Sequence, residues 1–123
     1  MGAVAAAVAG VSRLYGLGTV PTSPAYPYGS YSAALGRGDS YTLATEGIRW
    51  GRVVVQTFGK TPTSALAVTE AVRAALVDVR LDITGYDTSP CRAELDPQVT
   101  RDPDDNGVLV VTTTFTFTAT KEA

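Results

Sequence analysis

Residues 48–79 read IRWGRVVVQTFGKTPTSALAVTEAVRAALVDV, and the first part of this stretch has the pattern of a β-strand. Its centre is a run of three valines, which favours a strand that is covered at least partly on both faces. Alternation predicts two faces, one with Ile48, Trp50, Val54 and Phe58 and the other with Arg49, Val53, Val55 and Thr57. We expect Trp50 to be a core residue, with the neighbouring arginines facing solvent or a partner.

The second part of this stretch predicts a helix over residues 62–79. Thr61 followed by Pro62 is a typical helix start, because threonine caps the first turn and proline fits its first position. Apolar residues then recur at helical spacing: Ala65, Val68, Val72, Ala75, Leu76 and Val79. Small residues on this face suit close packing on a sheet.

The residues before this stretch predict a short helix, a strand and a long loop. The helix is indicated by four residues that share one helical face, Val4, Val8, Val11 and Tyr15. The strand is indicated by closely spaced aromatic residues, Tyr26, Tyr28 and Tyr31. Residues 35–47 contain three glycines and no sustained hydrophobic period, which predicts a long loop between two strands.

Two shorter strands are predicted after the helix. Residues 81–87 alternate between apolar and polar side chains, as a short strand does. Residues 93–101 form a polar strand with Leu95 and Val99 as its buried positions. Pro97 places this strand at a sheet edge, because proline cannot donate to a ladder of hydrogen bonds.

The chain closes with a predicted hairpin turn and a long strand. Residues 102–107 (DPDDNG) form the turn, and residues 108–120 form the strand. One face of this strand carries Leu109, Val111, Thr113, Phe115 and Phe117. The order of elements predicts one α+β domain over residues 1–123, with an antiparallel or mixed sheet and its helices on one side.

Composition and charge exclude several function classes. The chain has 123 residues, 45% of them hydrophobic and 18% charged, as expected of a packed globular protein. Its net charge of −2 argues against a nucleic-acid binder that depends on phosphate contacts. The charge is uneven, because residues 1–60 carry five basic and two acidic side chains and residues 61–123 carry five basic and ten acidic ones.

The residues needed for catalysis or metal binding are scarce. The chain has no histidine, and Cys91 is its single cysteine. Neither a phosphate-binding glycine loop nor a nucleophile motif occurs. We therefore expect no enzymatic activity and no cofactor. The first positive charge, Arg13, follows the apolar start, so we expect a protein made in the cytoplasm without a signal peptide and without a membrane partner.

Two short motifs permit another class of function, a ligand-binding module. Residues 102–107 match the opening of an EF-hand calcium loop, but its twelfth position is Thr113 instead of glutamate. A hairpin turn explains the same residues. Arg37, Gly38 and Asp39 spell an adhesion tripeptide, which is too short a motif to carry that function.

The order of elements and several local patterns resemble the tail terminator, or tail-completion, proteins of long-tailed bacteriophages. The valine-rich strand RVVVQTFG is followed by the helix ALAVTEAVRAAL, in which the positions shared with the family are Ala65, Ala71, Val72, Arg73, Ala75 and Leu76. The acidic turn before the last strand matches through Arg101, Asp102, Asp104 and Gly107. The resemblance covers about residues 20–119.

This resemblance implies a structural virion protein at the junction of tail and neck. It implies a homo-hexameric ring that caps the tail tube, stops its polymerisation and joins it to the head-neck connector protein, with genome DNA only passing through the lumen. The alternative within phages is another ring component, either a tail tube protein or a head-closure protein.

The resemblance also implies a loop, at residues 35–47, that orders on assembly. Together with the charged residues of the following strand, this loop provides the candidate assembly contacts: Arg37, Asp39, Tyr41, Glu46, Arg49 and Arg52.

Overall fold

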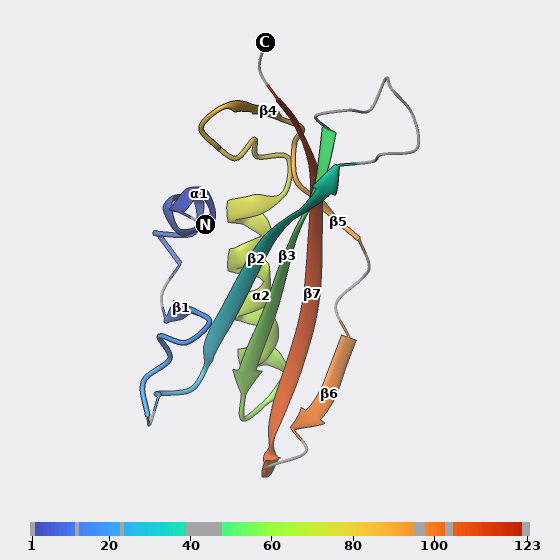
Figure 1. Ribbon diagram of the computed structural model, residues 1–123. Helices are drawn as coiled ribbons and strands as arrows, with labels where there is room; N and C mark the ends of the chain where they lie inside the picture. Colours follow the sequence, from blue (N-terminus) through green and yellow to red (C-terminus); the bar gives the residue numbers. More distant parts are fainter. Residues whose placement is uncertain are drawn as a thin grey trace.

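Strand β3 (Ile48–Gly59) is the centre of the fold, because it pairs with a long strand on each side. β2 (Tyr28–Gly38) and β7 (Asp105–Lys121) both run antiparallel to it (Figure 1), which confirms the strand predicted at residues 48–58. The computed structural model describes residues 2–11, 13–22, 24–38, 48–94, 98–102 and 105–121.

Four short strands complete the sheet that the described residues form. β1 (Leu14–Gly16) is parallel to β2 at one edge of the sheet. At the other edge β4 (Tyr86–Thr88), β5 (Arg92–Ala93) and β6 (Gln98–Asp102) each run antiparallel to β7, at successive levels along it. The mixed sheet and its helices confirm the predicted α+β class.

Helix α2 (Pro62–Leu76) covers one face of the sheet behind β3 (Figure 1), and it starts where the sequence predicts. The Thr61 hydroxyl accepts a hydrogen bond from the Ser64 N–H at 3.2 Å, and the Ser64 hydroxyl accepts one from the Thr61 N–H at 3.3 Å. This reciprocal cap satisfies two backbone donors at the start of the helix.

The helix ends at Leu76, three residues before the predicted end at Val79. Val77 is already extended, with a ψ of 132°, and Asp78 takes a left-handed conformation with a φ of 64°. Aspartate tolerates this conformation better than most residues. The Asp78 N–H then bonds to the Cys91 carbonyl at 2.8 Å, so backbone pairing with a distant segment replaces another helical turn.

The core lies between α2 and the inner face of the sheet. Its buried residues come from the N-terminal segment, α2, the two central strands and the segment before β5: Val4, Val8, Val53, Val55, Val72, Leu76, Leu81, Cys91, Phe115, Phe117 and Ala119. The core residues that come from β3 and β7 are odd-numbered, as alternation within a strand requires: Val53, Val55, Phe115, Phe117 and Ala119. The predicted inner face of β7 is confirmed by the burial of Val111, Thr113, Phe115 and Phe117, whereas Val108 and Val110, which have the other parity, are buried as well.

Two buried threonines join α2 to β3 through hydrogen bonds. The hydroxyls of Thr57 and Thr69 lie 2.8 Å apart, and each also lies within hydrogen-bond distance of the Ala65 carbonyl, at 3.1 and 3.2 Å. Both side chains are 1% exposed. Because buried hydroxyls are costly unless they are bonded, these contacts fix the position of the helix along the strand.

The N-terminal helix is shorter than the sequence pattern predicts. α1 spans only Gly2–Ala7, and Tyr15 belongs to β1 instead of a helix. Val4 and Val8 are nevertheless buried, as predicted. An alanine-rich helix of this length gains little stability by itself, whereas the chain around β1 forms two backbone hydrogen bonds with β2, of 2.9 and 2.8 Å.

The predicted loop at residues 35–47 was wrong for its first four residues. β2 continues to Gly38, and Leu35 pairs with Gly51 and Gly38 with Arg49 across β3. The register shifts between Leu35 and Gly38, as it does at a β-bulge, which glycine-rich sequence accommodates easily. Pairing with β3 thus overrides the weak strand propensity of this segment. Residues 39–47 lie outside the residues that the structure describes.

The two short strands predicted after the helix are differently placed. Within residues 81–87, only the last two belong to a strand, β4, which continues to Thr88, and residues 93–101 contain the end of β5 and most of β6. Val99 is 41% exposed, so its predicted burial was wrong. Among the described strands β6 pairs with β7 alone, which accords with the predicted edge and explains this exposure. Leu95 and Pro97 lie outside the described part of the chain.

The predicted turn at residues 102–107 is narrower in the structure. Asp102 pairs with Asp105 across the hairpin, so β7 begins at Asp105 and not at residue 108. Gly107 therefore lies in a strand. The calcium-loop hypothesis includes Asp104, which falls outside the described residues, so the structure does not test it.

Candidate assembly surface

Between Trp50 and Gln56 of β3 and between Thr112 and Thr118 of β7, the face of the sheet opposite α2 is built by even-numbered residues, most of which are polar. Both described helices contribute to the core on the other face. On β7 this outer face is a row of threonines, Thr112, Thr114, Thr116 and Thr118, which register with the outer residues of β3. Threonine suits such a surface, because its branched side chain favours strands while its hydroxyl tolerates water.

Trp50 lies on this outer face and is 61% exposed, so the expectation of a core tryptophan was wrong. Because side chains alternate between the two faces of a strand, Trp50 lies on the same face of β3 as Arg52 and Gln56, which are both exposed. The inner face carries odd-numbered residues such as Val53. A large exposed aromatic side chain in a strand is informative, because tryptophan is enriched in the centres of protein interfaces.

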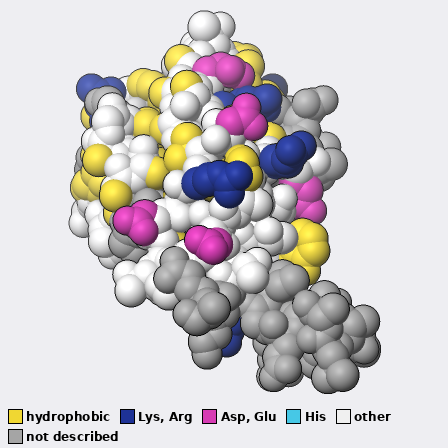
Figure 2. All heavy atoms as spheres, turned by 90° about the horizontal axis from the view of Figure 1, so that it is seen from above, with side chains coloured by type: hydrophobic (Ala, Val, Ile, Leu, Met, Phe, Trp, Pro, Cys, Tyr) yellow, Lys and Arg dark blue, Asp and Glu magenta, His cyan; other side chains and the backbone are white. Residues whose placement is uncertain are grey.

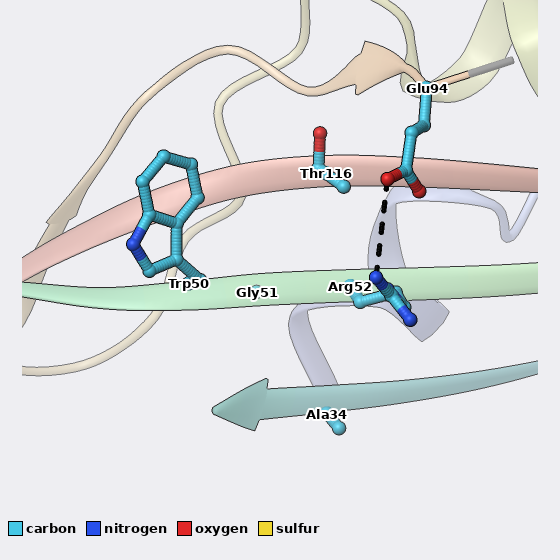
Figure 3. A pocket seen from close by; sticks show the side chains of 6 residues that line it. All are labelled: Ala34, Trp50, Gly51, Arg52, Glu94 and Thr116. Atoms are coloured by element: carbon cyan, nitrogen blue, oxygen red, sulfur yellow. Dashed lines mark ion pairs between the residues drawn. The ribbon is translucent and has the colours of Figure 1, made fainter. Parts of the chain in front are cut away.

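Trp50 borders a shallow hollow that crosses the strands of the outer face. Figure 3 shows Trp50 and Arg52 on either side of Gly51, Ala34 on β2, and Glu94 facing Arg52 across β7, next to Thr116. The hollow thus combines one exposed indole, an exposed pair of opposite charges and small neighbours. Its chemistry fits contact with another protein surface better than binding of a small molecule.

The ion pair in this hollow is weak as a stabilising contact. An Arg52 guanidinium nitrogen and a Glu94 carboxylate oxygen lie 4.0 Å apart, and the two side chains are 62% and 43% exposed. Water screens such pairs, which typically contribute between nothing and about 1 kcal/mol. Both charges are therefore available to a partner at little cost to the fold.

The structure places two of the six candidate contacts predicted from the sequence. Arg49 and Arg52 are both exposed, but they are three positions apart on β3 and so lie on opposite faces of the sheet. Arg37 belongs to β2, although its side chain is not described. Asp39, Tyr41 and Glu46 fall outside the described residues. The prediction that these six residues share one interface is therefore untested.

Sequence reasoning missed Trp50 and Glu94 as members of the outer surface. Trp50 shares its parity along the strand with the polar residues Arg52 and Gln56 but also with Val54 and Phe58, so alternation alone did not show which face is exposed. Glu94 carried no signal in the sequence. Its position next to Arg52 depends on the pairing of β5 with β7, which joins residues more than twenty positions apart.

A group of aromatic side chains lies at the end of the sheet where β3 finishes. The rings of Tyr28 and Phe58 stack with centroids 4.8 Å apart, and the ring of Tyr26 lies 5.4 Å from that of Tyr28. The Lys60 ammonium stands 4.7 Å above the ring of Tyr26. These contacts explain the aromatic spacing seen in the sequence as packing across neighbouring strands.

The described residues contain a buried thiol and no group of metal-binding side chains. No three acidic, cysteine or histidine side chains among them come together as metal ligands. Cys91 is buried, and burial raises the pKa of its thiol, which disfavours the reactive thiolate. At the end of the molecule that carries β4, acidic and basic side chains are interspersed (Figure 2). None of the described helices is long and apolar enough to cross a membrane.

Comparison with known proteins gives one family and one similar fold. No curated protein sequence matches the chain. Twelve chains of solved structures match it, and one of them, from the virion of a native gene transfer agent particle, has a TM-score of 0.68 and 19% sequence identity. That alignment covers 95% of this chain and 84% of the other, and at this identity it shows a shared fold alone. The family described as Tail completion protein gp17 matches residues 2–119, so the chain belongs to this family and is a structural tail protein of a phage-like virion.

Proposed function

We propose that this protein is the tail terminator of its virion. Six copies form a ring that caps the tail tube, stops its polymerisation and provides the surface on which the head-neck connector protein docks. Each copy acts as one domain over residues 1–123. The family supports a role at the completed tail, and the shared fold with a virion component is consistent with it.

The observation that carries the proposal is the exposed Trp50 on the outer face of the sheet. An indole that is 61% exposed, next to an exposed ion pair and a row of threonines, forms a surface with an apolar anchor and a polar surround. Protein interfaces are organised in this way, with aromatic anchors inside a polar rim. We assign this surface to contact with the tail tube or the connector.

The predicted contacts at Arg37, Asp39, Tyr41 and Glu46 belong to the same proposal. Arg37 lies near the end of β2, and the other three residues belong to the segment of the chain that joins β2 to β3. Arg49 and Arg52 extend the set to both faces of β3. DNA passes through the ring lumen without being gripped, since a chain with a net charge of −2 offers phosphate no general attraction.

The test combines purified protein with subunits of the cognate tail tube. Native mass spectrometry should detect hexamers, and negative-stain images should show rings on tube ends and tubes that stop growing once capped. Trp50→Ala should remain folded and lose capping. Gln56→Ala is the matched control, because Gln56 is also exposed on the outer face of β3.

Other outcomes identify the competing functions. Open-ended tubes made by this chain alone would indicate a tube protein, and rings that bind the connector but ignore tube ends would indicate a head-closure protein. A melting temperature that rises with calcium would indicate a ligand-binding module.

A further inference from the structure

We propose that copies of this chain join by pairing strand β6 of one copy, in an antiparallel manner, with the open part of β2 in the next copy. The inference rests on the ring proposed above and specifies the strand edges that meet in it. Four observations support it: an open edge on each side of the sheet, exposed apolar side chains at both edges, compatible strand directions, and an offset that fits a closed ring.

The side of β2 that faces away from β3 is open beyond Tyr31. β1 covers β2 only from Gly29 to Tyr31, and the last bond there, from the Leu17 N–H to the Tyr31 carbonyl, is 2.8 Å long. Because backbone groups alternate along a strand, Ala33 directs its N–H and carbonyl to the same side as Tyr31. None of the other described strands pairs with β2 on that side. The open part of β2, residues 32–38, therefore offers hydrogen bonds to a further strand.

On the other side of the sheet the open edge is that of β6. Next to β5, the Asp78 N–H bonds to the Cys91 carbonyl at 2.8 Å. Next to β4, the Thr88 hydroxyl donates to the Leu81 carbonyl at 2.6 Å, so residues 78–81 cover this part of the edge. Among the described strands β6 pairs with β7 alone, and Figure 1 shows it on the side opposite β2. One open edge on each side suits a ring, because every copy in a ring uses two different surfaces.

Apolar side chains are exposed at both open edges. Val99 of β6 is 41% exposed, and Leu17, where the cover of β2 by β1 ends, is 74% exposed. A shallow hollow lies at this point of the β2 edge, lined by Gly16, Leu17, Tyr31, Ser32 and Ala33. Edge strands that stay unpaired usually carry charged residues or proline. An exposed valine on one edge and a hollow beside an exposed leucine on the other therefore favour contact between the two edges.

The backbone of Val99 is directed away from the sheet. The carbonyls of Thr114 and Thr118 accept bonds of 2.8 Å from the residues on the β4 and β5 side, so the even-numbered residues of β7 bond toward that side. The partners of even-numbered β7 residues on β6 are Gln98 and Thr100. Val99 lies between these two and therefore turns its N–H and carbonyl away from β7, as Ala33 does from β3.

The strand directions allow the two edges to pair. β2 and β7 run in the same direction, since both are antiparallel to β3, and β6 is antiparallel to β7. In a neighbour of the same orientation, β2 is therefore antiparallel to β6. Val99 registers with Val111 and Ala33 with Val53, and both of these valines are buried on the face that α2 covers. Pairing of Val99 with Ala33 of the next copy thus keeps the helices of both copies on one side of the joined sheet.

The offset between the two edges fits a closed ring. Ala33 lies level with Phe115 of β7, through Val53, whereas Val99 lies level with Val111. From 111 to 115 is four residues, which is about 13 Å along the strand, and the four strand spacings from one β2 to the next span about 19 Å. Copies at equal height then have strands inclined by about 35° to the ring axis, which is typical of closed sheets.

Disulfide crosslinking tests the pairing. The Cα atoms of an antiparallel hydrogen-bonded pair lie about 5.5 Å apart, which suits a disulfide. The full chain with Ala33→Cys and Val99→Cys together should form crosslinked species up to the hexamer on oxidation. A mixture of the two single variants should form crosslinked dimers and nothing larger, because each copy then carries one half of the contact. Non-reducing electrophoresis and native mass spectrometry identify the products.

Two controls show whether a crosslink reports this pairing. Ala34→Cys with Val99→Cys is the matched control, because Ala34 lies on the same edge but its side chain points to the opposite face, so few crosslinks should form. Wild-type protein should not crosslink, since its single cysteine, Cys91, is buried.

A substitution in β6 tests the pairing without new cysteines. Val99→Pro removes an N–H that points away from β7, so the hydrogen bonds between β6 and β7 remain, while the proline ring obstructs a neighbouring strand. Hexamer formation, followed by sedimentation velocity, should weaken by about tenfold or more. Val99→Thr keeps the N–H and the branched shape, and it should assemble within about threefold of wild type.

The outcomes separate this inference from the ring itself. Hexamers that the Ala33→Cys, Val99→Cys protein forms without crosslinking overturn the assignment of edges and leave the ring standing. Crosslinking of Ala33→Cys alone would mean that like edges meet, which overturns the assignment as well. Wild-type protein that forms no hexamer at any concentration, alone or on tube ends, overturns both proposals.

Discussion

Replacing Gly51 by alanine tests how closely the ring of Phe117 packs against β3 in the core beneath the candidate assembly surface. A Cβ atom at Gly51 would stand 2.1 Å from Cζ of Phe117 and 2.4 and 2.5 Å from two further atoms of that ring. The nearest distance is about 1.3 Å shorter than the 3.4 Å at which ordinary contact begins. Phe117 is 2% exposed, so its ring has no solvent to move into.

The magnitude follows from the cost of overpacking. Forcing one extra carbon into a filled core typically costs about 1–3 kcal/mol, which lowers the melting temperature of a chain of this size by about 4–12 °C. Thermal unfolding followed by circular dichroism measures the shift. Gly10→Ala is the matched control, since a Cβ atom at Gly10 meets nothing within 4 Å.

A second substitution identifies the clash as the cause. In a Phe117→Leu background the far end of the ring is absent, so Gly51→Ala should cost at least about 1 kcal/mol less than it does in the wild type. If Gly51→Ala melts like the wild type, or if its cost is the same with leucine at position 117, the close approach of Phe117 to β3 is wrong.

Three further predictions concern the helix and the buried thiol. Val72→Asp places an unpaired charge at a position 1% exposed and should unfold the protein, whereas Ala71→Asp, at an exposed position, should melt normally. Thr61→Ala removes the helix cap and should cost about 1 kcal/mol in urea denaturation, against no measurable loss for Thr63→Ala. Burial raises the pKa of the Cys91 thiol in the folded protein. The stability that comes from burying the neutral thiol is therefore present below the ordinary thiol pKa, and it is lost as the pH rises through the pKa of the folded protein. Iodoacetamide should therefore modify Cys91 slowly at pH 8 unless urea is added, and rapid modification of the folded protein would contradict its burial.

The parts of the fold that the sequence predicts well are those with local causes. The start of α2 depends on Thr61 and Pro62, which act within one turn, and its buried face depends on spacing along one helix. The inner face of β7 follows from alternation within one strand. In these cases the residues that cause the structure lie close together in the sequence.

The parts that escaped prediction depend on distant pairing. Leu35 to Gly38 form a strand because β3 lies beside them, and Asp78 leaves the helix to bond with Cys91. Strand β5 brings Glu94 to Arg52 although no pattern joins the two residues. A single sequence shows local preference, whereas these contacts are decided by which strands become neighbours.

The alternation along β3 gives one strand two separable roles. Its odd-numbered residues Val53, Val55 and Thr57 are at most 1% exposed and hold the sheet to α2, while its even-numbered residues Trp50, Arg52 and Gln56 are exposed. Val53→Ala should therefore cost about 2 kcal/mol in unfolding free energy, because it removes buried apolar groups. Trp50→Ala should leave that free energy within about 0.5 kcal/mol of wild type and reduce only assembly. A Trp50 variant that loses stability and assembly together would mean that the indole belongs to the core, and the outer face would then have no anchor for a partner.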